Sequence, residues 1–154
     1  MVERELKVRP IRSGTVIDHI QAGQALNVLK ILGISGTTGA TVSVLMNVSS
    51  RKLGKKDIVK VEDRELREDE VNKIALIAPG ATINIVRDYA VVEKYAVDLP
   101  DVIVGVVRCQ NPSCISNTNE PIKPKMLVKG KNPVVLRCFY CDQPLTERIA
   151  EYLL

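Results

Sequence analysis

The chain has 154 residues, 45 % of them hydrophobic, and 22 Lys and Arg against 18 Asp and Glu give it a formal net charge of +4. This length fits one large or two small domains, and no apolar run approaches the roughly 20 residues that cross a membrane. The modest charge does not indicate the dense basic surface of a duplex-DNA-binding protein. The residues after Met1 lack the apolar core of a secretory signal, so we expect a soluble, cytoplasmic protein without a membrane partner.

The N-terminal part of the chain begins with strand-like and helix-like patterns. Residues 6–12 and 14–20 are rich in Val and Ile and are expected to be extended. An amphipathic helix is predicted next, because apolar residues recur at positions i, i+3, i+4 and i+7, namely Ala25, Val28, Leu29 and Leu32. Gly33 follows, at a position where helices commonly end.

The following residues continue the alternation. Two strand-like segments, residues 40–48 and 56–62, are joined by a turn at residues 49–54. A second helix is expected over residues 68–78, with three acidic residues in its first turn, and two more strands over residues 82–86 and 89–97. The order β-α-β-β-α-β with one extra strand predicts an α+β fold, a ferredoxin-like antiparallel sheet with two helices on one face. The other face is then free for a ligand or a partner.

A domain joint is expected near Asp98-Leu99-Pro100-Asp101, because a proline between carboxylates interrupts regular structure. The predicted domains are residues 1–99 and 100–154. The second is a small all-β domain, too short for a large core, and such domains commonly need a metal to fold.

All four cysteines lie in this second domain, as Cys109-x4-Cys114 and Cys138-x2-Cys141. Two close pairs on separate turns are typical of a zinc site, and four thiolates leave no open position for a catalytic water. We therefore predict one structural Zn²⁺ ion per chain. Two disulfides would need an oxidising compartment, and a redox Cys-x-x-Cys would leave the first pair unexplained.

Several cations are candidates for an anion site. Lys60 and Lys94 interrupt apolar strand segments and could meet a phosphate, although solvated strand lysines are the plainer interpretation. Arg9 and Arg12 could line an anion site, and His19, the single histidine, could bind a ligand or close a turn. No motif of a catalytic triad or a phosphate-binding loop is present, so an enzyme is not expected. The lysines between the cysteine pairs keep open an alternative function, a zinc-ribbon nucleic-acid-binding protein.

Four segments together resemble a known family: residues 12–20 (RSGTVIDHI), 54–62 (GKKDIVKVE), 78–84 (APGATIN) and 109–116 (CQNPSCIS). In sequence and order they are similar to the regulatory chain of aspartate carbamoyltransferase. The resemblance implies a non-catalytic subunit of a pyrimidine-biosynthesis enzyme, with an N-terminal allosteric domain that binds CTP, ATP and UTP. It also implies a zinc domain that docks on the catalytic chain, a regulatory-chain homodimer, and no nucleic-acid partner.

The resemblance further implies a nucleotide site formed by Val8, Arg9, Ile11, Arg12, Asp18, His19, Ile58, Lys60, Asn84, Val86, Tyr89, Val91 and Lys94. By this likeness Lys94 and Arg12 would meet the phosphates, while Asp18 and His19 would lie beside the ribose and phosphate. Lys60 would contact the base or ribose, and backbone groups near Ile11 and Tyr89 would read an exocyclic amino group. Arg9 and Pro10 stand where enterobacterial members have an acidic and a small residue, which leaves the effector preference open.

Overall fold

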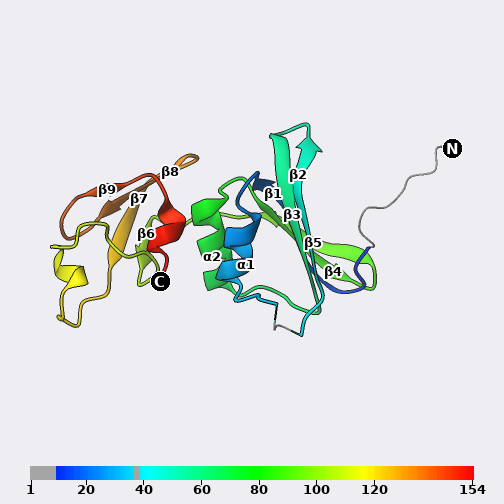
Figure 1. The fold of residues 1–154 in the computed structure, drawn as a ribbon, viewed down its shortest axis with the longest axis horizontal. Helices are drawn as coiled ribbons and strands as arrows, with labels where there is room; N and C mark the ends of the chain where they lie inside the picture. Colours follow the sequence, from blue (N-terminus) through cyan, green and yellow to red (C-terminus); the bar gives the residue numbers. More distant parts are fainter. Residues whose placement is uncertain (1–9, 37–38) are drawn as a thin grey trace.

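The computed structural model describes residues 10–36 and 39–154, and all structural statements below concern those residues. They form two sheets, with two helices between them (Figure 1). The first sheet has five antiparallel strands in the order β2-β3-β1-β4-β5. Its elements are β1 (Gly14–Gln21), α1 (Ala25–Ile31), β2 (Val42–Ser50), β3 (Gly54–Glu62), α2 (Glu68–Ile77), β4 (Thr82–Arg87) and β5 (Ala90–Ala96). The predicted ferredoxin-like arrangement is confirmed.

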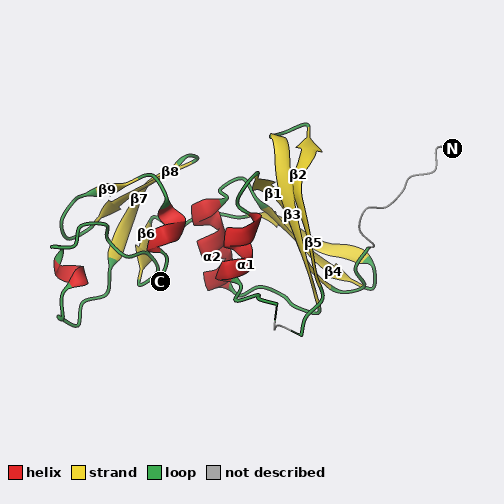
Figure 2. Cartoon of the chain, in the orientation of Figure 1, coloured by secondary structure: helices red, strands yellow, loops and turns green. Residues whose placement is uncertain are grey.

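Both helices cover the same face of this sheet, the face turned toward the second sheet (Figure 2). Alternate strand residues such as Ile17, Val59 and Ile83 are fully buried beneath the helices, because successive side chains of a strand point to opposite faces. Val28 and Ile74 supply the helical side of this core. The opposite face of the sheet carries no helix.

Asp57 of β3 is a fully buried acid on the helix-covered face. One carboxylate oxygen accepts hydrogen bonds from the backbone N–H groups of Gly23 and Ala25, each at 3.0 Å. The other accepts from the backbone N–H of Asn47, also at 3.0 Å. Because these donors belong to the start of α1 and to β2, one side chain joins three segments.

Glu70 performs a similar task at the start of α2. It is 3 % exposed, accepts a hydrogen bond from the backbone N–H of Arg67 at 3.1 Å, and pairs with the guanidinium of Arg64. Arg64 also donates to the carbonyl of Leu32 at 2.8 Å. The loop before α2 is therefore tied to the end of α1.

The second sheet has four strands in the order β6-β7-β8-β9. Its elements are β6 (Val102–Val104), the 3-10 turn η1 (Ile115–Asn117), β7 (Lys125–Lys131), β8 (Val134–Cys138), β9 (Pro144–Leu145) and the 3-10 turn η2 (Ile149–Tyr152). Strand β7 includes Lys125, Lys129 and Lys131, which the sequence indicated only as cations between the cysteine pairs. No helix of the described residues is long and apolar enough to cross a membrane.

The end of the chain connects the two halves. Leu154 donates its N–H to the carbonyl of Val106 at 2.8 Å and accepts a hydrogen bond from Lys73 of α2 at 3.2 Å. Arg108 lies over the ring of Tyr152, 4.9 Å from its centroid. The buried apolar residues of both sheets form one continuous cluster.

The expected N-terminal strand, residues 6–12, falls mostly outside the described residues. Its described part, Pro10 to Arg12, is not in a strand, and regular structure begins at Gly14. Pro10 has no N–H for a sheet hydrogen bond, which agrees with this late start.

Gly14 is predicted to be essential for the pairing of β1 with β3. Its φ is +142°, and a Cβ at this position would lie 2.1 Å from the carbonyl oxygen of Val61. We expect Gly14→Ala to lower the free energy of unfolding by about 2–4 kcal/mol, measured by urea titration. Gly36→Ala is the matched control, since nothing lies within 4 Å of a Cβ there, and equal stability of the two variants would contradict the prediction.

Candidate metal centre and ligand-binding face

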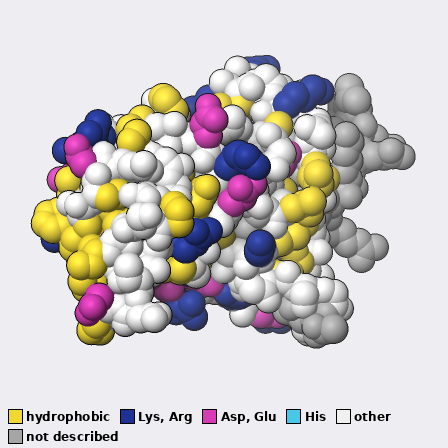
Figure 3. All heavy atoms as spheres, turned by 60° about the vertical axis from the view of Figure 1, so that its left-hand side comes forward, with side chains coloured by type: hydrophobic (Ala, Val, Ile, Leu, Met, Phe, Trp, Pro, Cys, Tyr) yellow, Lys and Arg dark blue, Asp and Glu magenta, His cyan; other side chains and the backbone are white. Residues whose placement is uncertain are grey.

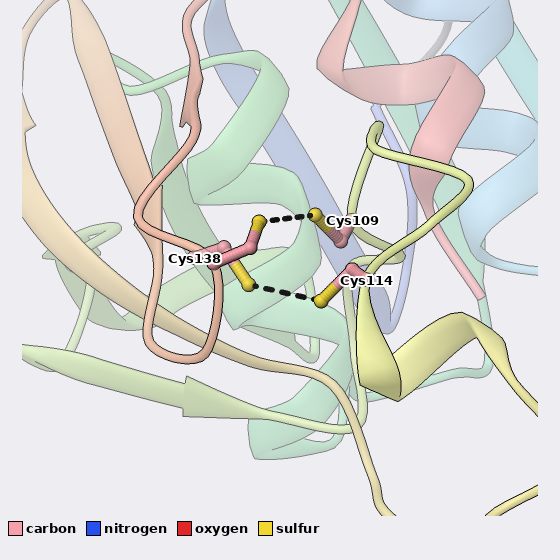
Figure 4. A group of neighbouring side chains, drawn as sticks. Cys109, Cys114 and Cys138 are labelled. Carbon is pink, nitrogen blue, oxygen red and sulfur yellow. Dashed lines mark hydrogen bonds between the residues drawn. The ribbon is translucent and has the colours of Figure 1, made fainter.

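The four cysteine sulfurs converge at one point of the second half of the chain. Figure 4 shows the thiols of Cys109, Cys114 and Cys138 turned toward one another. The Sγ atoms of Cys109 and Cys141 are 3.5 Å apart, and those of Cys114 and Cys138 are 3.6 Å apart. All four sulfurs lie within 4.8 Å of one another. The predicted metal residues are therefore brought together.

These separations fit a tetrahedral metal site. Zn–S bonds of about 2.3 Å place tetrahedral sulfurs about 3.8 Å apart, close to the observed distances. A disulfide would require about 2.05 Å, and all four cysteines are free. A set of four sulfur donors selects zinc among the common structural metals, and the four cysteines fit one structural zinc ion.

Two tight turns present the sulfurs. In the first, the side-chain amide of Asn117 donates to the carbonyls of Cys109 and Asn111 at 2.9 and 2.7 Å, and the N–H of Asn111 points at the Cys109 sulfur. In the second, at the end of β8, Asp142 adopts a left-handed conformation and donates its N–H to the carbonyl of Cys138 at 3.0 Å. Each turn thus directs two sulfurs toward the common point.

Burial changes the acidity of these thiols. Desolvation raises the pKa of Cys109 to about 12 and also raises the pKa of Cys138. For Cys141, slight burial raises the pKa, but hydrogen bonds from the Gln143 backbone and from neighbouring side chains outweigh it and lower the value to about 7. Without a cation Cys109 and Cys138 therefore hold their protons at neutral pH, and metal binding must displace these protons.

Apolar side chains surround the metal centre at the surface. Ile115, Phe139 and Tyr140 are 45, 52 and 40 % exposed, and we call them the apolar rim. The rings of Phe139 and Tyr140 meet edge to face with centroids 5.2 Å apart, and the ammonium of Lys125 lies 4.2 Å from the Phe139 ring centroid. Figure 3, with the second sheet turned forward, shows hydrophobic side chains at the surface of this half.

The helix-free face of the first sheet brings several predicted nucleotide residues into one line. Lys60 of β3 pairs with Val16 of β1, Val16 pairs with Asn84 of β4, and Asn84 pairs with Lys94 of β5. Directly paired residues of antiparallel strands point to the same face. We call Lys60, Val16, Asn84 and Lys94 the outer-face row. With strands about 4.8 Å apart, the Cα atoms of Lys60 and Lys94 are about 14 Å apart.

Further predicted residues flank the row on the side of the β4–β5 turn. Tyr89, 67 % exposed, adopts a left-handed conformation and donates its N–H to the carbonyl of Arg12 at 2.9 Å. The guanidinium of Arg12 lies 3.9 Å from the carboxylate of Asp88 in a solvent-exposed pair. The remaining predicted residues here are Ile11 and Val86, which are buried, and Val91, which is exposed and pairs with Val86.

Asp18 and His19 flank the row on the opposite side, toward the end of β1, at an irregularity in the pairing of β1 with β3. His19 has a left-handed backbone, and its Nδ1 is 3.0 Å from the hydroxyl of Thr82. Partial burial raises the pKa of Asp18, but the Lys56 ammonium at 2.9 Å and the His19 N–H outweigh it, so the value is lowered.

Three polar residues near this face were not predicted from the sequence. Ser43 lies opposite Lys60 in the strand register, Lys56 forms a salt bridge with Asp18, and the hydroxyl of Thr82 contacts His19. Strand alternation could have identified Lys56, because it shares the period of Ile58 and Lys60. Ser43 and Thr82 required the strand register. The predicted residues Val8 and Arg9 lie outside the described residues.

Metal binding is predicted to support the fold of the second half alone. We expect Cys109→Ala to abolish binding of one zinc ion per chain, because three thiolates leave the site incomplete. Hydrogen exchange should then accelerate across residues 101–154, while the first sheet stays protected. Ser113→Ala is the control, since Ser113 lies in the same loop without supplying a sulfur. Full zinc content in the Cys109 variant would contradict the prediction.

Comparison with known proteins agrees with this geometry. A model of the aspartate carbamoyltransferase regulatory chain, allosteric domain, matches residues 6–98, and a model of its metal binding domain matches residues 101–151. Proteins named aspartate carbamoyltransferase regulatory chain are similar over nearly their full length. The one from Hyperthermus butylicus is 57 % identical, covering 96 % of this chain and 94 % of its own. That from Methanoculleus marisnigri is 56 % identical, covering 98 % and 96 %.

The resemblance inferred from four short segments is thereby confirmed. Both the part that matches the allosteric domain and the cysteine-containing part are covered, so the likeness does not depend on the metal site alone. The chain belongs to the aspartate carbamoyltransferase regulatory chain family and is a non-catalytic regulatory subunit.

Proposed function

We propose that this chain binds nucleoside triphosphates of the CTP, ATP and UTP type and passes allosteric control to the catalytic chain of aspartate carbamoyltransferase. The observation that carries the proposal is the outer-face row. It places two lysines at the two ends of a line across the sheet, with an amide between them. An extended nucleotide needs cations for its phosphates and amide or backbone groups for its base and ribose.

The two lysines are available for a ligand. The side chains of Lys60 and Lys94 make no hydrogen bond or ion pair with another of the residues described. Asn84 lies between them and already donates to the carbonyl of Val16 at 3.2 Å, so its amide oxygen is the group left to accept. We assign Lys94 and Arg12 to the phosphates, and Lys60 to the base or ribose.

The remaining predicted residues complete the proposed site. Asp18 and His19 border the row on one side along the strands and Tyr89 on the other, while Val8 and Arg9 are included from the sequence alone. We propose domain limits of residues 1–99 for the nucleotide domain and 100–154 for the zinc domain. The four cysteines are free thiols, and thiols stay reduced in a compartment such as the cytoplasm, where we place the protein.

The apolar rim supports the proposed docking of the zinc domain on the catalytic chain. Aromatic side chains next to a rigid metal-bound turn resemble the core of a protein interface, where aromatics are enriched. Ile115 belongs to the first turn, and Phe139 and Tyr140 belong to the second. Without the metal, the two turns would no longer hold the three apolar-rim residues next to one another. We also propose that two regulatory chains pair as a homodimer, as the family resemblance implies.

Lys94 is predicted to contribute directly to nucleotide affinity. We expect Lys94→Ala to weaken CTP binding by about tenfold or more, about 1.4 kcal/mol, because a phosphate loses a charged partner. Isothermal titration calorimetry measures the change. Lys129→Ala, on an exposed residue of the second sheet, serves as the control. Equal affinity in the Lys94 variant and the control would remove Lys94 from the proposed site.

Assembly with the catalytic chain is predicted to depend on zinc. Sedimentation of the chain mixed with its cognate catalytic chain should reveal a heavy complex that EDTA dissociates, because the rim requires the metal-bound turns. If the two chains sediment separately at micromolar concentration, the assembly proposal is contradicted. Salt-dependent binding to an oligonucleotide would then favour the zinc-ribbon alternative.

A further inference from the structure

We propose that Asp57 is the positioning residue that links the nucleotide-binding face of the first sheet to helix α1 and, through α1, to the groove facing the second sheet. The inference rests on the nucleotide function proposed above and adds a route for its transmission. Asp57 touches no proposed ligand. Its effect is on the placement of α1, and it contributes nothing to the nucleotide contacts themselves.

The residues of strand β3 alternate between the helix-covered face and the helix-free face of the sheet. Asp57, Val59 and Val61 are buried beneath the helices, whereas Lys56, Ile58 and Lys60 alternate with them on the helix-free side. Lys56 holds Asp18 at 2.9 Å, and Lys60 belongs to the outer-face row. A ligand that shifts this part of β3 must therefore shift the backbone that carries the Asp57 carboxylate.

The carboxylate in turn holds the start of α1. Gln24, which precedes the helix, makes no capping hydrogen bond with its own side chain. Asp57 substitutes for it by accepting from Ala25 and Gly23, both at 3.0 Å. A negative charge at this end is also favoured by the helix dipole. The position of this seven-residue helix is thus set from the sheet, by a residue far away in the sequence.

The two strands that neighbour β3 both change their pairing register near Asp57. The pairing of β1 with β3 shifts between Ile17 and Ile20, and the pairing of β2 with β3 shifts between Leu45 and Val48. Asn47, inside the second irregularity, has φ of +59° and donates its N–H to Asp57. Bulges leave ladder groups unpaired, so the carboxylate supplies much of the local bonding that joins the strands to α1.

Helix α1 faces the other half of the molecule. Gln24, Asn27 and Lys30 line a groove of about 560 Å³ whose opposite wall includes Arg148 and Glu151, next to the chain end that Lys73 holds. A displacement of α1 changes the shape of this groove. The geometry therefore connects the nucleotide face to α1 through β3 and Asp57, and places α1 across this groove from the C-terminal segment.

The test compares Asp57→Asn with Glu70→Gln, a matched change at the other buried acid that holds a helix start. In Asp57→Asn the NH₂ group replaces one carboxylate oxygen and faces a backbone N–H donor. The hydrogen bonds accepted by that oxygen are therefore lost. CTP affinity is measured by calorimetry, and hydrogen exchange of α1 is measured with and without CTP. Activity of the holoenzyme reassembled with its catalytic chain is measured with and without CTP.

We expect CTP to alter α1 exchange in wild type and in Glu70→Gln. In Asp57→Asn this change should disappear, and the CTP effect on holoenzyme activity should fall at least about fivefold, with CTP affinity kept within about threefold. A wild-type response in Asp57→Asn, or equal loss of response in both variants, would overturn the inference and leave the nucleotide function standing. Absence of CTP binding to wild type would overturn both.

Discussion

The second half of the molecule depends on four sulfur atoms brought to one point. Its strands are short, β6 with three residues and β9 with two, and cannot enclose a large apolar core. The cysteine turns tie the segment after β6 to the end of β8. The first turn follows Val107, which pairs with Leu153, so the position of the C-terminal segment also depends on the metal centre. A metal here acts in place of a core, as is common for domains of this size.

In the first half, strand alternation separates the core from the proposed nucleotide face. The same strand β3 contributes Val59 and Val61 to the core and Lys60 to the opposite face. Because antiparallel pairing fixes which residues are opposite each other, burial of one set determines the line formed by the other. The outer-face row is thus a consequence of packing on the helix side, and the backbone of the sheet sets the spacing of its two lysines.

Much of this could be predicted from sequence. Apolar periodicity predicted β4 and α2 to within about two residues, and cysteine spacing predicted the metal residues, because both signals are local. Strand β7 was missed because its lysines and Gly130 resemble a loop. It is a strand because Met126 pairs with both Ile103 and Cys138. The role of Asp57 was also hidden, since its donors come from distant segments and are known only once the register is fixed.

The segment that connects the two halves, residues 98–101, makes several contacts with the second sheet and the core. Asp101 accepts a hydrogen bond from the N–H of Val128 at 2.8 Å, and Asp98 pairs with Lys131 at 3.3 Å. Leu99, between them, is buried in the core shared by both sheets. A segment held in this way is not a free tether between the two sheets. Coupling then requires only that a ligand bind one arrangement of the two halves more tightly than another, because differential affinity alone shifts such an equilibrium.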